Sequence, residues 1–510
     1  MVRNVLQFLE ASAQRLPDKI ALEDENNKLT YSEYVTQAKT MGSYLANNEL
    51  KGLKSKPVAV VIDRNIKSLI SFMGIVYSGN FYVPIDNTMP KERVDLIYNT
   101  LNPVAVIDAR ENTSKPIEGA IVFDEAMASG KIDEETLQRI RFEAVDIDPI
   151  YCIFTSGSTG VPKGVLTNHR SIVDLVEAFG EAFGFDENMV HGNQSPFDYD
   201  GSSKDIYNSM RNGSRVVIVP KKLFMLPKLL LEFIEERGIN TLIWAVSALR
   251  IVSDFKAFNS VDFKAKMRYI MFSGEVMPVK ALNYWIDNVP DPMYVNLYGP
   301  TEITCNCTYY IVDGKKDEWK ALPIGKPFTN TRIILLDEKR EKVITKPKET
   351  GELCVAGTSL SLGYWNNKEK TKDAFIQNPL ITEYESLIYA TGDMAYYDEN
   401  GDLIFASRRD YQIKHMGHRI ELGEIEVALN AIPFIETSCC LYDGARGKIV
   451  CFYQSQSDDT RAIVKLLGEK LPKYMWPNIF KRYDKLPLNT SSKIDRAKLK
   501  KLIIDGDGKE

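Results

Sequence analysis

The sequence is poor in the residues that build disulfide frameworks and zinc sites. It has seven cysteines, none of them in C-x-x-C spacing, and four histidines among 510 residues. An odd, scattered set of cysteines without nearby histidines predicts neither disulfides nor a structural zinc ion. One alternative stays open, in which the closely spaced Cys305 and Cys307 are a fragment of a metal site. We therefore expect a protein of a reducing compartment, the cytoplasm.

Long apolar runs and blocks of like charge are absent as well. No apolar run approaches the roughly 18 residues that cross a bilayer. The net charge is −5, with acidic and basic residues mixed along the length, and residues 1–19 carry Glu10 inside an amphipathic pattern rather than a secretion signal. We expect no membrane insertion and no nucleic-acid partner.

What the sequence has is size and apolar content, 510 residues of which 44% are hydrophobic. A chain of this length exceeds what a single hydrophobic core usually organises, so two or more domains are expected. Short apolar runs alternate with longer amphipathic stretches such as 226–238, which predicts an α/β fold with sheets covered by helices. The runs are residues 58–63, 104–108, 215–219, 269–274 and 332–337.

The order of predicted strands and helices changes near residues 407–410, and this change predicts a domain boundary. Residues 1–409 would form a large N-terminal domain, and residues 410–510 a small mobile α+β domain. The expected elements of the small domain are a helix at 421–432, strands at 438–443 and 448–454, and a helix at 460–471.

A glycine-rich stretch, TSGSTGVPKG, follows a short apolar strand at residues 151–154. Its open backbone N–H groups and hydroxyls suit an anionic phosphate. It is not a Walker loop, because Pro162 rather than glycine precedes Lys163. By itself the stretch fits a flexible surface loop equally well.

Eight further motifs accompany this stretch. They are LTYSEY (29–34), YVPID (82–86), NLYGPTE (296–302), GELCVAG (351–357), ATGD (390–393), SRRDYQIKHMGHRIELGEIE (407–426), LPKYMWP (471–477) and SSKIDR (491–496). In this order they resemble the core motifs of the adenylate-forming superfamily, from about residue 5 to about residue 500. MFSGEVMPVK (271–280) and YGPTE are most similar to stand-alone D-alanine:carrier-protein ligases and peptide-synthetase adenylation domains.

The resemblance implies a two-step reaction with ATP and Mg²⁺. A carboxylate would attack the α-phosphorus of ATP to give an acyl-adenylate and pyrophosphate, and a thiol would then take the acyl group. Two anions must meet, so cations and preorganised donors are needed. Thr301, Glu302 and Lys493 would be catalytic, with Glu302 holding Mg²⁺ and Lys493 bridging the two anions.

The nucleotide-binding residues are implied in the same way. Asp393 would accept both ribose hydroxyls, and Tyr298 would offer a flat face to adenine. The superfamily usually has arginine where Ala390 stands, so some support for Asp393 is missing or comes from elsewhere. It usually has glycine where Ser492 stands, and this difference would alter the freedom of the loop before Lys493 more than its charge. The full set is Thr155, Ser156, Gly157, Ser158, Thr159, Gly160, Lys163, Tyr298, Asp393 and Arg408.

Two residues are implied in domain movement and thiol access. Asp410 matches the hinge about which the small domain would rotate between the two steps. Gly417 would line the passage for a phosphopantetheine arm, since a residue without Cβ permits close approach. A plain turn glycine is the alternative.

The stretch SPFDYDGSSKDIY (195–207) bears on the acid that is activated. It can be aligned with the superfamily through Asp198 or Asp200, and the spacing to Gly213 and the following strand favours Asp200. The resemblance implies that this residue pairs with a substrate α-ammonium, which favours an amino acid. An inward Lys204 would favour an acidic side chain, whereas a Lys204 that points to solvent or pairs near Asp205 would not, and Trp244 would narrow the site. The implied lining is Asp200, Gly201, Lys204, Trp244, Met271, Ser273, Gly274, Leu297, Cys305 and Asn306.

The acyl acceptor is expected to be the phosphopantetheine of a separate carrier protein, because no carrier domain is recognisable in the sequence. Three alternatives remain open: a D-alanine:carrier-protein ligase, an acyl- or aryl-CoA synthetase, and a nucleotide-binding scaffold with a decayed site. Asp200 argues against the second. Retention of Lys163, Glu302, Asp393, Arg408 and Lys493 argues against the third.

Overall fold

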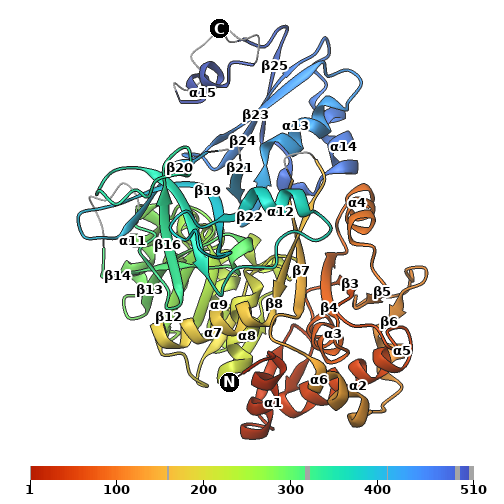
Figure 1. The fold of residues 1–510 in the computed structure, drawn as a ribbon. Coiled ribbons are helices and arrows are strands. Elements are labelled where there is room, and N and C mark those ends of the chain that lie inside the picture. Colours follow the sequence, from red (N-terminus) through yellow and green to blue (C-terminus); the bar gives the residue numbers. More distant parts are fainter. Residues whose placement is uncertain (1, 158–159, 316–321, 410–411, 489–493, 505–510) are drawn as a thin grey trace. The chain divides into compact units, whose positions relative to one another are not determined.

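A computed structural model describes residues 2–157, 160–315, 322–409, 412–488 and 494–504 (Figure 1). The chain divides into two compact units. The first consists of residues 1–87, 101–153 and 164–409, and the second of residues 88–100, 154–163 and 410–510. Two segments of the predicted N-terminal domain thus group with the C-terminal region. The mobility of the small domain stays a prediction.

A nine-stranded sheet forms the centre of the first unit. Strands β9 to β13 are parallel where they pair with one another, and β14 and β2 are antiparallel to their neighbours. In spatial order the strands are β15 (Lys326–Pro327), β14 (Thr308–Val312), β13 (Met293–Tyr298), β12 (Tyr269–Ser273), β11 (Thr241–Ala245), β9 (Val190–Asn193), β10 (Arg215–Ile218), β1 (Ile20–Glu23) and β2 (Lys28–Thr30).

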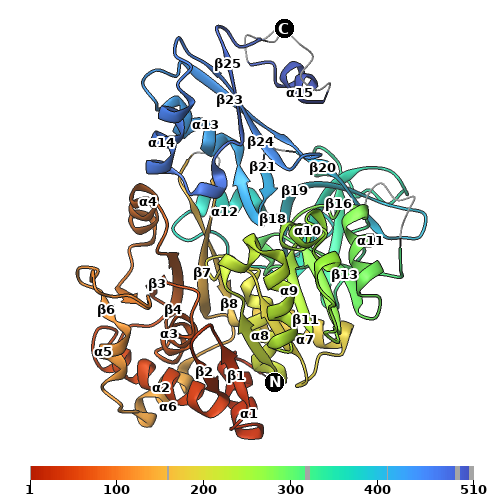
Figure 2. The same ribbon diagram turned by 180° about the vertical axis from the view of Figure 1, so that it is seen from behind.

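Helices cover both faces of this sheet (Figures 1 and 2). Alternate residues of each strand point to opposite faces. Trp244, Phe272 and Tyr294 pack against α9 (Pro227–Glu236), α10 (Val246–Asp254) and α11 (Val279–Asn288). Met271 and Leu297 pack on the other face against α7 (His169–Phe183). This alternation decides which residues can share a site.

Two further sheets complete the strands of the first unit. The six-stranded sheet has the order β6 (Ile121–Val122), β5 (Ala105–Asp108), β3 (Pro57–Ile62), β4 (Phe81–Asp86), β7 (Pro149–Thr155) and β8 (Lys163–Asn168). The five-stranded sheet has the order β16 (Thr331–Leu336), β17 (Gly351–Gly357), β19 (Leu387–Tyr397) and β18 (Phe375–Gln377), with β20 (Leu403–Arg408) paired to β19.

The other helices of the first unit begin with clear local signals in several places. At α2, Thr30 and Glu33 form a capping box in which each side chain accepts the other residue's backbone N–H. The helices are α1 (Leu6–Arg15), α2 (Tyr31–Asn47), α3 (Ile66–Tyr77), α5 (Phe123–Met127), α6 (Glu134–Glu143), α8 (Ser202–Asn212) and α12 (Lys368–Ala374), with 3₁₀ turns η1 (Lys221–Met225), η2 (Ala257–Ser260) and η3 (Thr301–Ile303).

The second unit is built on a three-stranded sheet and a hairpin. Its elements are α4 (Lys91–Leu101), the hairpin β21 (Gln412–His415) and β22 (His418–Glu421), α13 (Leu422–Asn430), β23 (Thr437–Asp443), β24 (Lys448–Gln454), α14 (Thr460–Lys470), the turn η4 (Lys473–Met475), β25 (Ile479–Tyr483) and α15 (Arg496–Ile504). The predicted helices and strands of this region are confirmed. The parallel strand β25 and helix α15 were missed, because neither has a strong periodic pattern.

Candidate active site

The predicted acid site gathers where parallel strands end. Trp244, Ser273 and Tyr298 lie at or next to the last residues of β11, β12 and β13, and Asp200 lies in the loop after β9. Ligands of open parallel sheets bind at the carboxyl ends of the strands. The sequence thus places these residues along one edge of the sheet, and the face of each strand decides which of them meet.

Asp393 is buried on β19 and carries two partners. Arg408, paired with it across β19 and β20, forms an ion pair with one carboxylate oxygen, and the Tyr298 hydroxyl donates to the other. Burial, followed by the charge of Asp393, raises the pKa of Tyr298 well above its usual value. The hydroxyl therefore stays protonated and donates. Each carboxylate oxygen keeps a further lone pair for a ribose hydroxyl.

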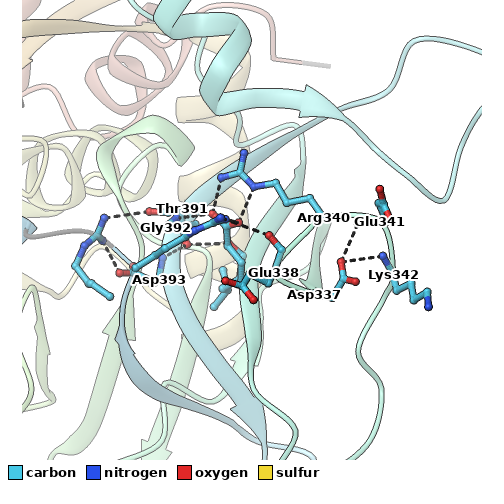
Figure 3. Close-up of polar contacts among 12 residues, drawn as sticks. Asp337, Glu338, Arg340, Glu341, Lys342, Thr391, Gly392 and Asp393 are labelled. Carbon is cyan, nitrogen blue, oxygen red and sulfur yellow. Dashed lines mark hydrogen bonds and ion pairs between the residues drawn. The ribbon is translucent and has the colours of Figure 1, made fainter. Parts of the chain in front are cut away.

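A second carboxylate supports the turn before Asp393. Glu352 on β17 is buried and accepts the Gly392 N–H at 3.1 Å. Arg340 donates to both of its oxygens at 2.7 and 2.8 Å, and Arg409 approaches one of them at 3.2 Å (Figure 3). The arginine missing at Ala390 therefore has a counterpart in this cluster, which reaches Gly392 from a different loop. The sequence did not reveal Glu352, Arg340 or Arg409 as supporting residues, since GELCVAG gave no sign of a partner.

Glu302 and Thr301 lie on the short turn η3 and are buried. The Tyr364 hydroxyl donates to Glu302 Oε1 at 2.7 Å and so fixes the direction of this carboxylate. After the turn, Thr304 and Cys305 adopt left-handed φ angles of 58° and 77°, which for non-glycine residues marks local strain. This turn reverses the local course of the backbone after Glu302 and so determines where Cys305 and Asn306 lie.

The stretch predicted to bind phosphate belongs to the second unit and forms hydrogen bonds within it. The Ser156 hydroxyl donates to the Arg419 carbonyl at 2.7 Å and accepts the Glu421 N–H at 2.9 Å. The Gly157 N–H donates to Glu424 at 3.1 Å. A phosphate at this amide would take the place of the Glu424 carboxylate.

Glu424 is itself a buried carboxylate of the second unit. Burial raises its pKa, while its ion pair with Arg93 of α4 acts in the opposite direction. Neither residue was predicted as part of a site. Thr155 is also buried, and its hydroxyl has no hydrogen-bond partner among the described residues. Gly160 has a φ of 80°, which suits glycine, and Lys163 begins β8.

Lys204 and Ser273 meet in the predicted acid site. Lys204 lies in the first turn of α8 and is 1% exposed, and its ammonium donates to Ser273 Oγ at 3.0 Å. The alternative in which Lys204 points to solvent is excluded by this burial. Asp200 is also buried, four residues before Lys204. A Cβ on Gly201 would lie 2.8 Å from both Ser195 Oγ and the Tyr199 ring, so only glycine fits there.

Trp244 requires a correction. Its indole packs on the face of the sheet opposite Met271 and Leu297, where it lies 5.3 Å from the Phe224 ring, and its N–H donates to the Gly192 carbonyl at 2.5 Å. Trp244 therefore belongs to the core beneath α9 to α11. The structure does not bring it together with Met271, because adjacent strand registers place the two residues on opposite faces.

The other predicted lining residues are buried except Gly274. Met271 and Leu297 share the face that α7 covers. Cys305 and Asn306 are buried after η3, and among the described residues Asn306 Oδ1 has no hydrogen-bond partner. Gly274 has a φ of 94° directly after β12, a conformation that favours glycine.

Gly417 has an evident structural role. With Met416 it forms the two-residue loop between β21 and β22, and both have positive φ angles, 80° and 52°. A hairpin of this length requires that conformation. A place in a thiol passage stays a prediction. Ser158, Thr159, Asp410 and Lys493 lie outside the described residues.

Disulfide bonds, metal-ligand clusters and membrane-spanning helices are absent from the described residues. All seven cysteines are buried, and none of them forms a disulfide bond among the described residues. Across the described ranges no group of three or more His, Cys, Asp or Glu side chains could hold a metal ion, so the metal fragment at Cys305 and Cys307 gains no support. No helix of the described residues has the length and apolar content to cross a bilayer.

Comparison with known proteins decides the family. Residues 9–365 match the model of the AMP-binding enzyme family. The chain belongs to this family. The predicted resemblance to adenylate-forming enzymes is confirmed.

Two relatives of this AMP-binding enzyme, both from Bacillus licheniformis, differ greatly in how much of their length the chain covers. Bacitracin synthase 1 is 32% identical over 500 residues, which are 97% of this chain and 9% of the synthase. The D-alanine–D-alanyl carrier protein ligase is 28% identical over 513 residues, which are 98% of this chain and 99% of the ligase. The chain therefore spans a small part of the synthase and nearly all of the ligase.

Solved structures confirm the α/β fold. The Vibrio cholerae adenylation domain AlmE, in complex with glycyl-adenosine-5'-phosphate, has a TM-score of 0.82 at 19% identity, covering 98% of each chain. Holo-PA1221, a protein containing adenylation and PCP domains, has a TM-score of 0.81 at 24% identity, covering 97% of this chain and 84% of that one. At these identities the likeness concerns the fold.

Proposed function

We propose that this AMP-binding enzyme activates an amino acid with ATP and transfers it to a thiol. In the first step a carboxylate oxygen bonds to the α-phosphorus, and the bond to the β-phosphate breaks with release of pyrophosphate. In the second step a thiolate bonds to the acyl carbon and AMP leaves. The observation that carries the proposal is Asp393, a buried carboxylate held between Arg408 and Tyr298.

Within the described residues each group has a definite task. Asp393 binds the ribose through oxygens whose direction Arg408 and Tyr298 fix. Asp200, buried ahead of α8, pairs with the substrate α-ammonium, which excludes acids without an amino group. Lys493 supplies the cation at the α-phosphate by its place in SSKIDR, outside the described residues.

Glu302 fits a magnesium ion. Mg²⁺ binds through one or two carboxylates together with substrate phosphates, and Glu302 offers a buried carboxylate with one oxygen committed to Tyr364. A bound Mg²⁺ would neutralise phosphate charge and align the leaving pyrophosphate. Glu302 would hold it, and Tyr364 would fix the direction of that carboxylate.

The acceptor of the second step is the phosphopantetheine thiol of a carrier protein acting in trans. Support comes from the ligase relative, whose name specifies a carrier protein and whose length this chain matches almost completely. The peptide-synthetase relatives support amino acids as the substrate class.

An ATP–pyrophosphate exchange assay tests the proposal. The purified chain with Mg²⁺ should catalyse exchange with at least one member of a panel of L- and D-amino acids. Octanoate and benzoate should not support it. With pantetheine as the thiol, mass spectrometry should detect an aminoacyl thioester.

Two variants provide the contrast. Asp393→Asn should reduce exchange by about 100-fold, since a neutral amide cannot accept from both ribose hydroxyls. Asp254→Asn, at an exposed carboxylate on α10, should leave exchange unchanged. Exchange with octanoate or benzoate and with none of the amino acids would overturn the proposal.

A further inference from the structure

Lys204 is buried, and no carboxylate of the described residues is in an ion pair with its ammonium. Its only hydrogen bond in the described part of the chain is to the neutral hydroxyl of Ser273, and no described carboxylate forms an ion pair with it. An ammonium has three donors, so this one has capacity for two more acceptors. Burying an unpaired charge is unfavourable, which points to a ligand that brings the missing anion.

The neighbouring carboxylates do not fill this role. Asp205 follows Lys204 in α8 but points to different partners: its oxygens lie 3.0 Å from Asn193 Nδ2 and 3.4 Å from His191 Nδ1. Asp200, four residues before Lys204, is the buried carboxylate that the proposed function assigns to the substrate α-ammonium. Under that function the cation at 204 and the carboxylate at 200 have different tasks.

The position of Lys204 in its helix adds to the case. It is the third residue of α8, whose N-cap, Gly201, provides no side-chain hydrogen bond. The first turn of a helix carries partial positive charge, so a lysine is disfavoured there and an anion is favoured. An anionic group beside Lys204 would thus be stabilised by the ammonium and by the helix end together.

Ser273 connects Lys204 to the strand edge of the predicted acid site. It is the last residue of β12, two residues after Met271, and so faces the same side of the sheet as Met271 and Leu297. Helices α7 and α8, which lie side by side, cover this side (Figure 1). The Lys204 and Ser273 pair is therefore on the side of the sheet that carries the predicted lining.

We infer that the substrate is an α-amino acid with an acidic side chain. This rests on the proposed function and specifies its substrate class. The side-chain carboxylate accepts hydrogen bonds from Lys204 and Ser273, while the α-ammonium pairs with Asp200. The ammonium of Lys204 then has an opposite charge beside it, and an uncharged side chain would leave it without one among the described residues.

Exchange rates over matched amino acids test this inference. The panel contains glutamate and aspartate, their amides glutamine and asparagine, and methionine and leucine, in both stereochemical forms. An acidic member should exceed its own amide in kcat/KM by about 100-fold, the penalty for leaving a buried charge unpaired. Because acid and amide have nearly the same shape, the comparison isolates charge.

Variants of the pair give a second readout. Lys204→Met should lower kcat/KM for the acidic substrate by about 100-fold and reverse the preference toward methionine or leucine. It should not lower the melting temperature, because an apolar residue of similar volume replaces a buried charge. Lys228→Met, at an exposed lysine of α9, is the matched control and should change neither selectivity nor rate.

The outcomes separate the two proposals. A wild-type preference for amides or apolar amino acids, or an unchanged preference in Lys204→Met, would overturn the acidic substrate and leave amino-acid activation standing. Exchange with no amino acid at all would overturn both. If Lys204→Met does not fold, the wild-type ranking of acid against amide still decides.

Discussion

His169, one of four histidines in the chain, is buried at the start of α7 with 3% of its surface exposed. Its Nδ1 accepts the backbone N–H of Val5 at 3.4 Å, which requires a neutral ring. Burial lowers its pKa to about 3. Protonation of this ring would place a charge inside the core and remove the acceptor for the N-terminal segment.

The low pKa of His169 predicts a loss of stability in acid. The unfolded histidine titrates near 6.5, so the contribution of the neutral ring is complete above that pH and is lost as pH falls toward 3. Between pH 7.5 and pH 5 the wild type should lose about 2 kcal/mol more free energy of unfolding than His169→Gln. Urea titrations at both pH values measure this. Equal losses in the two proteins would contradict the buried, neutral state.

At the scale of the element, β17 supports its neighbour β19. The two strands are antiparallel partners, and Glu352 of β17 holds the Gly392 N–H immediately before Asp393. Arg340 and Arg409 neutralise Glu352 from a loop and from the end of the first unit's chain. Under the proposed function Glu352 is therefore a positioning residue, because it would act on Asp393 through the backbone.

Glu352→Gln should weaken nucleotide binding without changing recognition of the acid. The amide can still accept the Gly392 N–H but leaves two arginines without an anion, so the turn should lose its fixed direction. We expect KM for ATP to rise about ten-fold and KM for the amino acid to stay the same. Exchange kinetics with each substrate varied in turn separate the two constants.

The two arginines provide an internal control for that prediction. Arg340 is bidentate, whereas Arg409 is 46% exposed and makes one longer contact. Arg340→Gln should therefore reproduce most of the effect on KM for ATP, and Arg409→Gln little of it. A rise in both KM values for all three variants would indicate a general loss of structure.

At the scale of the whole molecule, the residues predicted to bind one nucleotide belong to both units. Asp393, Arg408 and Glu302 lie in the first unit, and Ser156 and Gly157 lie in the second. If the proposed function holds, such a division suits an enzyme that rearranges its domains between two chemical steps. The sequence predicts that Lys493 acts in the first step alone.

Lys493→Ala should separate the two steps. Substrate-dependent pyrophosphate exchange should fall by more than about 100-fold, because the cation between carboxylate and α-phosphate is lost. Transfer of the acyl group to pantetheine from a chemically prepared aminoacyl-adenylate should remain within a factor of about two of the wild type. Loss of ATP binding, measured by calorimetry, would instead refute a role in catalysis.

Much of the fold could be predicted because its signals are local. Apolar runs such as 58–63 and 269–274 formed buried strands, and the periodic stretch 226–238 contained α9. Helix α4 and the stretch 154–163 grouped with the second unit against expectation. Contacts such as Arg93 with Glu424, more than three hundred residues apart in sequence, produce that grouping, and no local pattern encodes them.

The sequence by itself determined the family of this protein: the order of its motifs indicated an adenylate-forming enzyme and predicted the groups that would meet phosphate, ribose and acid. The tertiary structure decided the surroundings of those groups. It buried Lys204 beside Ser273, turned the Tyr298 hydroxyl to Asp393, and placed Trp244 on the other face from Met271. The physical reason is that residue type and spacing fix what a side chain can do, whereas burial, strand register and long-range partners fix its charge balance and its direction.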